Sequence, residues 1–242
     1  MANPALSESR FSNLEFVSNQ NAMTINGTIN KTAISLSLLI VAGFYTYTTN
    51  GVNFIWPGFI LGFIVALVTM FKKEWAPVTV PIYAILEGLA LGGLSLVYEE
   101  HLAPVDGGFD GIVVQAIGIT GCILFSLLFA YRSGMIVVTQ QFRSMVITAT
   151  LGIFLFFMIN MIISLFGGQM SGVLNPLNSG LMSILFSLFV VGIASMNLVL
   201  DFDFIEKASE KGLPKYMEWY GAFGLLVTLV WLYLEILRLL AK

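Results

Sequence analysis

The chain of 242 residues is 57% hydrophobic and only 10% charged. Because soluble domains carry about 25% charged residues, this composition excludes an ordinary soluble domain and favours a membrane protein. The formal net charge of −3 argues against a nucleic-acid partner, while a single Cys and a single His exclude an intramolecular disulfide, a thiolate cluster and a multi-His metal site.

Residues 1–31 are rich in Asn, Ser and Thr and show no apolar period. They also lack the charged-then-apolar pattern of a cleavable signal peptide. The sequence therefore predicts a polar, mostly disordered cytoplasmic segment over 1–31, with a short helix possible near 7–17. A single membrane domain is expected over 32–242.

Seven apolar runs follow one another in this domain. A spanning helix needs about 20 apolar residues, and helices satisfy their own backbone hydrogen bonds in hydrocarbon. The expected fold is an all-α integral membrane protein with seven transmembrane helices. The predicted spans are 32–48, 52–71, 78–98, 111–131, 144–166, 180–200 and 219–240.

The basic residues predict the orientation of the spans, because positive charge is retained on the cytoplasmic side. The first nine of the eleven Lys and Arg residues fall on one side of the predicted spans, and only Arg238 and Lys242 fall on the other. The N-terminus is therefore expected inside and the C-terminus outside. An even number of spans, with six helices and one re-entrant segment, stays open.

The connection over 99–110 has the opposite charge. It holds four carboxylates and no Lys or Arg. Such a loop could be a mouth that attracts cations, or simply a solvated surface loop.

Two small-residue motifs stand in neighbouring spans: Gly58 and Gly62 in the second, and Gly88 and Gly92 in the third. Glycines four residues apart let helix backbones approach closely in membranes. The motifs predict tight helix packing and carry no chemistry.

Carboxylates within hydrocarbon are functional candidates, since burying them costs several kcal/mol. Glu87 lies near the middle of the third span, which holds no basic residue. It must face the interior, be protonated, or find a partner on another helix. Glu235 stands in the outer half of the last span, three residues before Arg238, so the two can pair on one helix face.

The densest acidic segment is Leu200–Glu206, at the inner end of the sixth span. Asp203 can reach Lys207 at i+4, which favours a surface position, whereas Asp201 can point inward. The chain then re-enters the membrane at Glu218, which faces Asp201 from the adjacent helix. Two carboxylates close together in a low dielectric share a proton and respond to pH. The alternative is a solvated acidic cap.

No enzyme is expected. The last span has no Lys for a retinal Schiff base, and the single His101 stands in a connection rather than beside a mid-span Ser. Cys122 has no His or acid near it in sequence and is expected to pack as a small residue.

Several segments resemble the Bax-inhibitor-1-like (transmembrane Bax inhibitor motif) family, and its bacterial branch in particular. These segments are Tyr83–Gly88, Leu200–Glu206, Gly212–Pro214, Glu218–Phe223 and Leu232–Leu240. The resemblance implies a seven-helix fold with the seventh helix central, a bacterial inner-membrane location and, as in several members, a pH-sensitive calcium leak. It places Asp201 at the first of two aspartates that form the family's gate. The second aspartate is replaced by Thr228.

Two hypotheses follow. The first is a pH-sensitive calcium or cation leak channel whose pathway and pH-sensing residues are Glu87, Asp201, Asp203, Glu218 and Glu235. Calcium binds six to eight oxygen ligands, and the candidate ligands in this chain are the carboxylates of Asp201 and Glu87. No cofactor is expected besides this transported ion. The second is a non-conducting regulator that binds a membrane protease or a stress-response complex.

Overall fold

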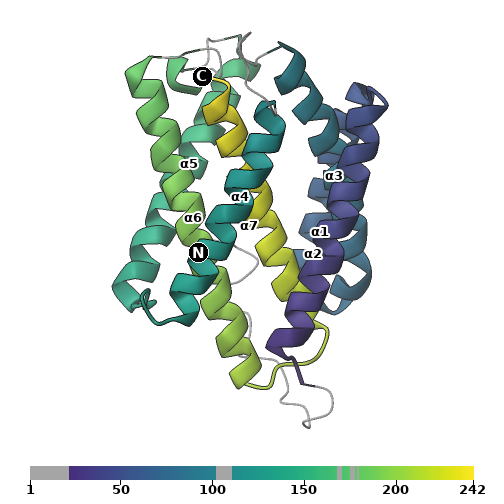
Figure 1. Ribbon diagram of the computed structural model, residues 1–242, viewed down its shortest axis with the longest axis vertical. Helices are drawn as coiled ribbons and strands as arrows, with labels where there is room; N and C mark the ends of the chain where they lie inside the picture. The colour runs from purple at the N-terminus through teal and green to yellow at the C-terminus, as the bar shows by residue number, and fades with distance from the viewer. Residues whose placement is uncertain (1–21, 102–110, 168–170, 175–177, 179) are drawn as a thin grey trace. The chain divides into compact units, whose positions relative to one another are not determined.

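A computed structural model describes residues 22–101, 111–167, 171–174, 178 and 180–242. The expected helix near 7–17 and residues 102–110 of the acidic connection lie outside these residues. The prediction that 99–101 belong to a connection is wrong, because the third helix continues to His101. Within them, seven helices are long and apolar enough to cross a membrane, which confirms the expected fold class (Figure 1). They are α1 (Ile25–Thr48), α2 (Ile55–Phe71), α3 (Ala76–His101), α4 (Ile112–Arg132), α5 (Gln140–Leu165), α6 (Leu181–Glu210) and α7 (Met217–Leu240).

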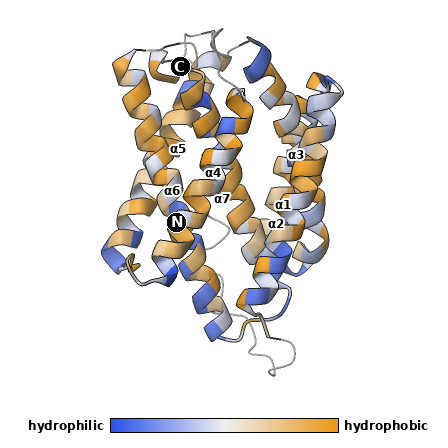
Figure 2. Cartoon of the chain, viewed as in Figure 1, coloured by the Kyte–Doolittle hydropathy of each residue, from blue (hydrophilic) through white to orange (hydrophobic). Residues whose placement is uncertain are grey.

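The surface of these helices is apolar to a degree that only lipid can solvate. Large side chains stand open on several helices, with exposed fractions of 76% for Trp56, 69% for Phe125 and 72% for Leu181. Hydrophobic residues fill the middle of the helices and hydrophilic ones gather toward many helix ends (Figure 2). Because a soluble monomer rarely exposes such large apolar patches, the structure supports a multi-pass membrane protein.

The chain divides into two compact units, and the division falls within α3, α6 and α7. One unit holds α1, α2, the part of α3 up to Val97, and residues 201–227. The other holds residues 98–200, with α4, α5 and most of α6, together with residues 228–242 of α7.

In the first unit, glycines bring α1, α2 and α3 into backbone contact, as the sequence motifs predict. A β-carbon on Gly88 would collide with the carbonyl oxygen of Leu39, and one on Gly92 would collide with that of Gly43. On α2, a β-carbon on Gly58 would come within 2.8 Å of the Leu86 carbonyl oxygen. Each of these three helical glycines is therefore required by a close approach to a neighbouring helix.

The second unit has its own apolar core between α5, α6 and the end of α7. Ile153, Val190 and Ile193 are buried at its centre. Around them pack Ala149, Phe157, Phe186, Met196 and Trp231. A polar contact crosses the same interface, where the Asn197 amide donates to the Thr150 hydroxyl at 2.9 Å.

The two largest errors in the predicted boundaries fall at the start of α1 and at the end of α6. α1 begins at Ile25 rather than near residue 32, because the Thr24 hydroxyl accepts a hydrogen bond from Gly27 N–H and caps the helix. At the other end, α6 continues to Glu210, ten residues past the predicted end at 200. Both extensions are polar, so hydropathy alone did not reveal them.

Burial differs among the helices. In their most apolar stretches, 61% of the residues are buried in α3 and in α7, against 17% in α1, α2 and α5. The buried fraction of α7 is thus among the two highest of the seven helices, as expected for a helix that the others surround. That α3 is buried equally is a finding the sequence did not predict, and α3 is the helix that carries Glu87.

Candidate functional site

Glu87 is a buried acid near the middle of α3, with 7% of its surface exposed. Its carboxylate lies against Gly62 of α2, where a β-carbon would stand only 2.8 Å from Oε2. Among the described residues, no hydrogen bond or ion pair reaches this carboxylate. The acid therefore faces the protein interior, as expected for a functional position, and packs tightly there.

Aromatic rings stand beside this acid. Tyr83 precedes Glu87 by one turn on α3 and is itself buried. Its ring meets that of Phe223 on α7 edge to face, with centroids 5.2 Å apart. These contacts fix the face of α3 that carries Glu87 against the first half of α7.

Glu218, in the first turn of α7, is held by α1. Its Oε1 accepts hydrogen bonds from the Thr24 backbone N–H at 3.1 Å and from the Thr24 hydroxyl at 2.9 Å. The Lys31 ammonium lies 3.6 Å from Oε2, which is buried and accepts no hydrogen bond from the described residues. The sequence placed Glu218 opposite Asp201, whereas its hydrogen bonds and ion pair are made with α1.

Asp201 and Asp203 are both buried, with exposed fractions of 1% and 6%. The pair between Asp203 and Lys207 forms as predicted, at 2.8 Å. The prediction that this pairing leaves Asp203 at the surface is wrong. Residues 201–205 are all buried, so this turn of α6 is covered on every side, and exposure begins at Glu206 and Lys207.

Glu235 belongs to the second unit and forms the ion pair that its spacing predicts. Nη1 of Arg238 lies 3.1 Å from both carboxylate oxygens, and its guanidinium stands over the Phe157 ring at 5.3 Å. Glu235 is only 2% exposed, so the pair is buried on the acid side. This geometry marks a structural contact between α7 and α5.

Lys242 forms a clamp that sequence reasoning missed. Its ammonium donates to the carbonyl of Ser183 at 2.9 Å, to that of Val173 at 3.3 Å, and to the hydroxyls of Ser183 and Ser187 at 2.6 and 2.8 Å. Burial, reinforced by Arg238, lowers the pKa of Lys242 below its ordinary 10.5. The Ser183 hydroxyl in turn donates to the Val173 carbonyl at 3.0 Å, so the clamp joins the end of the chain to the start of α6 and the segment before it.

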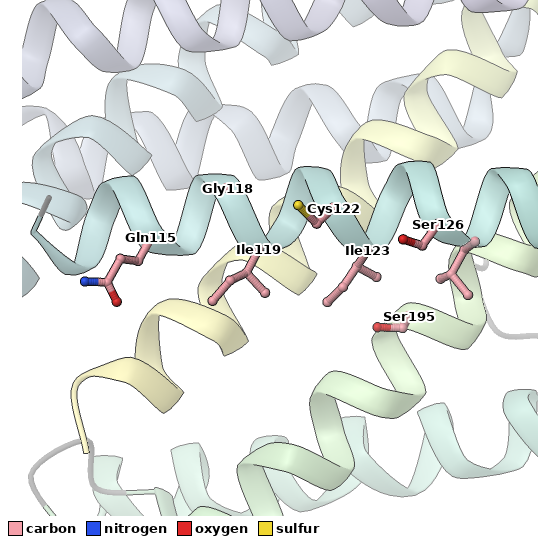
Figure 3. A pocket seen from close by; sticks show the side chains of 8 residues that line it. Gln115, Gly118, Ile119, Cys122, Ile123, Ser126 and Ser195 are labelled. Carbon is pink, nitrogen blue, oxygen red and sulfur yellow. The ribbon is translucent and has the colours of Figure 1, made fainter.

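A groove runs along α4 in the second unit, with a volume of about 670 Å³. Its walls are mostly apolar, and Figure 3 shows Gln115, Ile119, Ile123 and Ser126 on the side of α4 that Ser195 approaches from α6. Cys122 lies on the same stretch and is exposed rather than packed. None of the predicted pathway residues lines this groove.

Four of the five predicted site residues therefore belong to the unit formed by residues up to 97 and 201–227. They are Glu87, Asp201, Asp203 and Glu218, and all four are buried. In the part of the chain that the structure describes, no three His, Cys, Asp or Glu residues are grouped as metal ligands. The arrangement is thus a dispersed set of buried carboxylates and not a preformed metal centre.

The described residues hold seven membrane-length helices with acidic side chains buried among them, which defines a multi-pass membrane protein. The chain belongs to the Bax inhibitor 1 like family, whose model matches residues 3–242. No curated protein and no solved structure matches it. The family membership agrees with the resemblance in the sequence.

Proposed function

We propose that this protein is a pH-sensitive cation leak channel of the inner membrane, with calcium as its first candidate ion. The observation that carries the proposal is the state of Glu87. It is a carboxylate in the middle of a spanning helix, 7% exposed, with no hydrogen bond or ion pair from the described residues. A buried acid without a protein partner is costly, so it points to a proton or a cation as its counterpart.

The other buried acids support the same proposal. Asp201 lies within α6, nine residues before its end, and Glu218 lies in the first turn of α7, so buried carboxylates occur at further positions of this unit besides Glu87. Calcium favours carboxylate, carbonyl and water oxygens. At neutral pH charged acids would attract the ion, and in acid their protonation would remove that attraction and change the helix contacts around them.

The packing of Glu87 against Gly62 corresponds in this proposal to a closed state. The helix contacts at Gly58, Gly62 and Gly88 leave no room for a side chain between α3 and its neighbours. Conduction would therefore require α3 to separate from α2 or α1 near Glu87. We place the N-terminus in the cytoplasm and the C-terminus outside, following the distribution of basic residues.

Calcium uptake into proteoliposomes of the purified protein tests the proposal. We expect uptake above that of empty vesicles at neutral pH, and less uptake in acid. Uptake equal to that of empty vesicles at every pH would contradict it.

The second candidate function is a non-conducting regulator that binds a membrane protease or a stress-response complex. The contact between Glu87 and Gly62 favours it, because a carboxylate wedged against a neighbouring backbone can serve packing alone. In this case the vesicles carry no flux. Removal of residues 1–21 would abolish association with the partner and leave the melting temperature unchanged.

A further inference from the structure

The start of α1 is tied to the turn between α6 and α7. Met23 N–H donates to the Leu213 carbonyl at 2.6 Å, and the Ser209 hydroxyl donates to the Met23 carbonyl at 3.3 Å. Ala22 forms an antiparallel bridge with Pro214. The segment that leads into α1 is therefore fastened at one place, beside the first turn of α7.

Glu218 is the charged part of this fastening, and its own hydrogen bonding is incomplete. Oε1 accepts two hydrogen bonds from Thr24, but Oε2 accepts none from the part of the chain that the structure describes, and the Lys31 ammonium stands 3.6 Å from it. Charge-assisted hydrogen bonds measure about 2.7–2.9 Å, so the Lys31 ammonium is too distant to compensate this oxygen fully. A buried carboxylate in this state gains little net stability, which makes the contact easy to release.

Gly27 shows that α1 is shaped for this acid. A β-carbon at position 27 would occupy the place of the Glu218 carboxylate. Glycine within a helix costs about 1 kcal/mol relative to alanine. The glycine therefore weakens α1 locally and at the same time provides the seat for Glu218.

The same helix reaches the candidate ion site. Leu39 stands twelve residues after Gly27 on α1. Its carbonyl oxygen packs so closely on Gly88 of α3 that a β-carbon there would collide with it. Gly88 is the residue next to Glu87. Since an α-helix moves largely as a rigid element, the position of its first turn on Glu218 affects its seat on α3. All of these residues belong to one unit.

We propose that Glu218 is a latch: its contact with Thr24 and Lys31 holds α1 on α3 and keeps the passage at Glu87 closed. Release of α1 from Glu218 frees α3 at Gly88 and raises conduction. This inference rests on the proposed function and adds its regulation.

Gly27→Ala tests the latch without weakening α1, because alanine is the better helix former and its β-carbon displaces the carboxylate. In proteoliposomes we expect calcium flux roughly fivefold above wild type, the change that loss of one ordinary net hydrogen bond would give. Gly121→Ala on α4, where nothing lies within 4 Å of the new β-carbon, is the matched control and should leave the flux unchanged.

A cross-link tests the opposite change. Ala22→Cys with Pro214→Cys, in a Cys122→Ser background, places two thiols at a bridge position whose Cα separation suits a disulfide. Oxidation should reduce the flux and reduction should restore it. Hydrogen exchange gives a readout that needs no flux: backbone amides of residues 24–31 should exchange faster in Glu218→Gln than in wild type.

The outcomes separate the two claims. Wild-type flux that responds neither to Gly27→Ala nor to the cross-link would overturn the latch and leave the proposed function standing. Wild-type flux equal to that of empty vesicles would overturn the proposed function, and with it the latch as a regulator of flux. Unchanged exchange in Glu218→Gln would overturn the claim that this acid holds α1.

Discussion

The carboxylate of Glu87 and the backbone of Gly62 occupy adjoining space between α3 and α2. A β-carbon on residue 62 would stand 2.8 Å from Oε2 of Glu87, closer than such atoms come in folded proteins. Glycine at position 62 and glutamate at position 87 thus form a fitted pair, which explains the second glycine of the α2 motif.

Gly62→Ala should displace Glu87 and destabilise the protein. The close atom is the end of a flexible side chain and the next neighbour stands at 3.9 Å, so we expect a loss at the lower end of the about 1–3 kcal/mol that overpacking costs, partly offset by the higher helix propensity of alanine. Thermal unfolding in detergent would show a lower Tm. Gly118→Ala on α4, with nothing within 4 Å of its β-carbon, is the control, and its Tm should stay equal to or above that of wild type. Equal Tm values for the two variants would argue against the fitted pair.

Asp201→Asn should flatten the dependence of calcium flux on pH. The side chain is 1% exposed, and the amide keeps its shape but cannot bind or release a proton in this range. Flux would be measured in proteoliposomes from neutral to mildly acidic pH. Asp203→Asn is the comparison, since that acid already pairs with Lys207. A pH profile of Asp201→Asn that superimposes on wild type would remove Asp201 from the sensing role.

The ion pair between Glu235 and Arg238 should matter for stability and not for conduction. Glu235→Gln leaves a half-buried guanidinium without its charge partner, and breaking a buried pair costs about 3–5 kcal/mol. Because Arg238 is 24% exposed, we expect the lower end of that range. The double variant with Glu235→Met and Arg238→Met should regain much of the loss. Unfolding midpoints of wild type and the two variants check this, and a Glu235→Gln variant as stable as wild type would refute it.

Lys242→Met should destabilise the second unit by about 1–3 kcal/mol, because it removes the donor for Ser183, Ser187 and Val173 O. Lys211→Met, at an exposed site in the turn that follows α6, is the control and should have little effect.

The contribution of Lys242 also depends on pH. Its pKa in the folded state is lowered by burial below the ordinary 10.5, so the unfolded chain binds more protons between the two values. The free energy of unfolding that Lys242 contributes therefore rises as pH increases from the folded pKa to the unfolded pKa of 10.5, and it is lost again as pH falls back to the folded pKa. Unfolding of wild type and Lys242→Met, compared across alkaline pH, would show this slope in wild type alone. Parallel slopes would contradict it.

Much of the fold could be predicted because hydrocarbon imposes a simple requirement on sequence. Long apolar runs locate all seven spans, and the glycines of α2 and α3 reveal their close approach. Polar helix ends escaped the same reasoning: Thr24 caps α1 inside a segment that reads as disordered, and α6 continues through charged residues to Glu210. Helix propensity and capping, not hydropathy, decide these ends.

The candidate site was predictable in part. Local spacing revealed the pairs of Asp203 with Lys207 and of Glu235 with Arg238. It could not reveal the contact between Thr24 and Glu218, which are 194 residues apart, or the clamp of Lys242 on Ser183. Partners of this kind are set by tertiary packing, and for the same reason the burial of Asp203 did not follow from its neighbours in sequence.

Calcium flux through Glu87→Gln, measured beside wild type in proteoliposomes, tests the central claim most directly. At an effective dielectric constant of about 20, one charge 4 Å from a monovalent cation is worth roughly 4 kcal/mol, so loss of this charge should lower the flux tenfold or more. Glu100→Gln, exposed near the end of the same helix, is the control and should conduct as wild type. Flux through Glu87→Gln equal to wild type would contradict the proposed pathway.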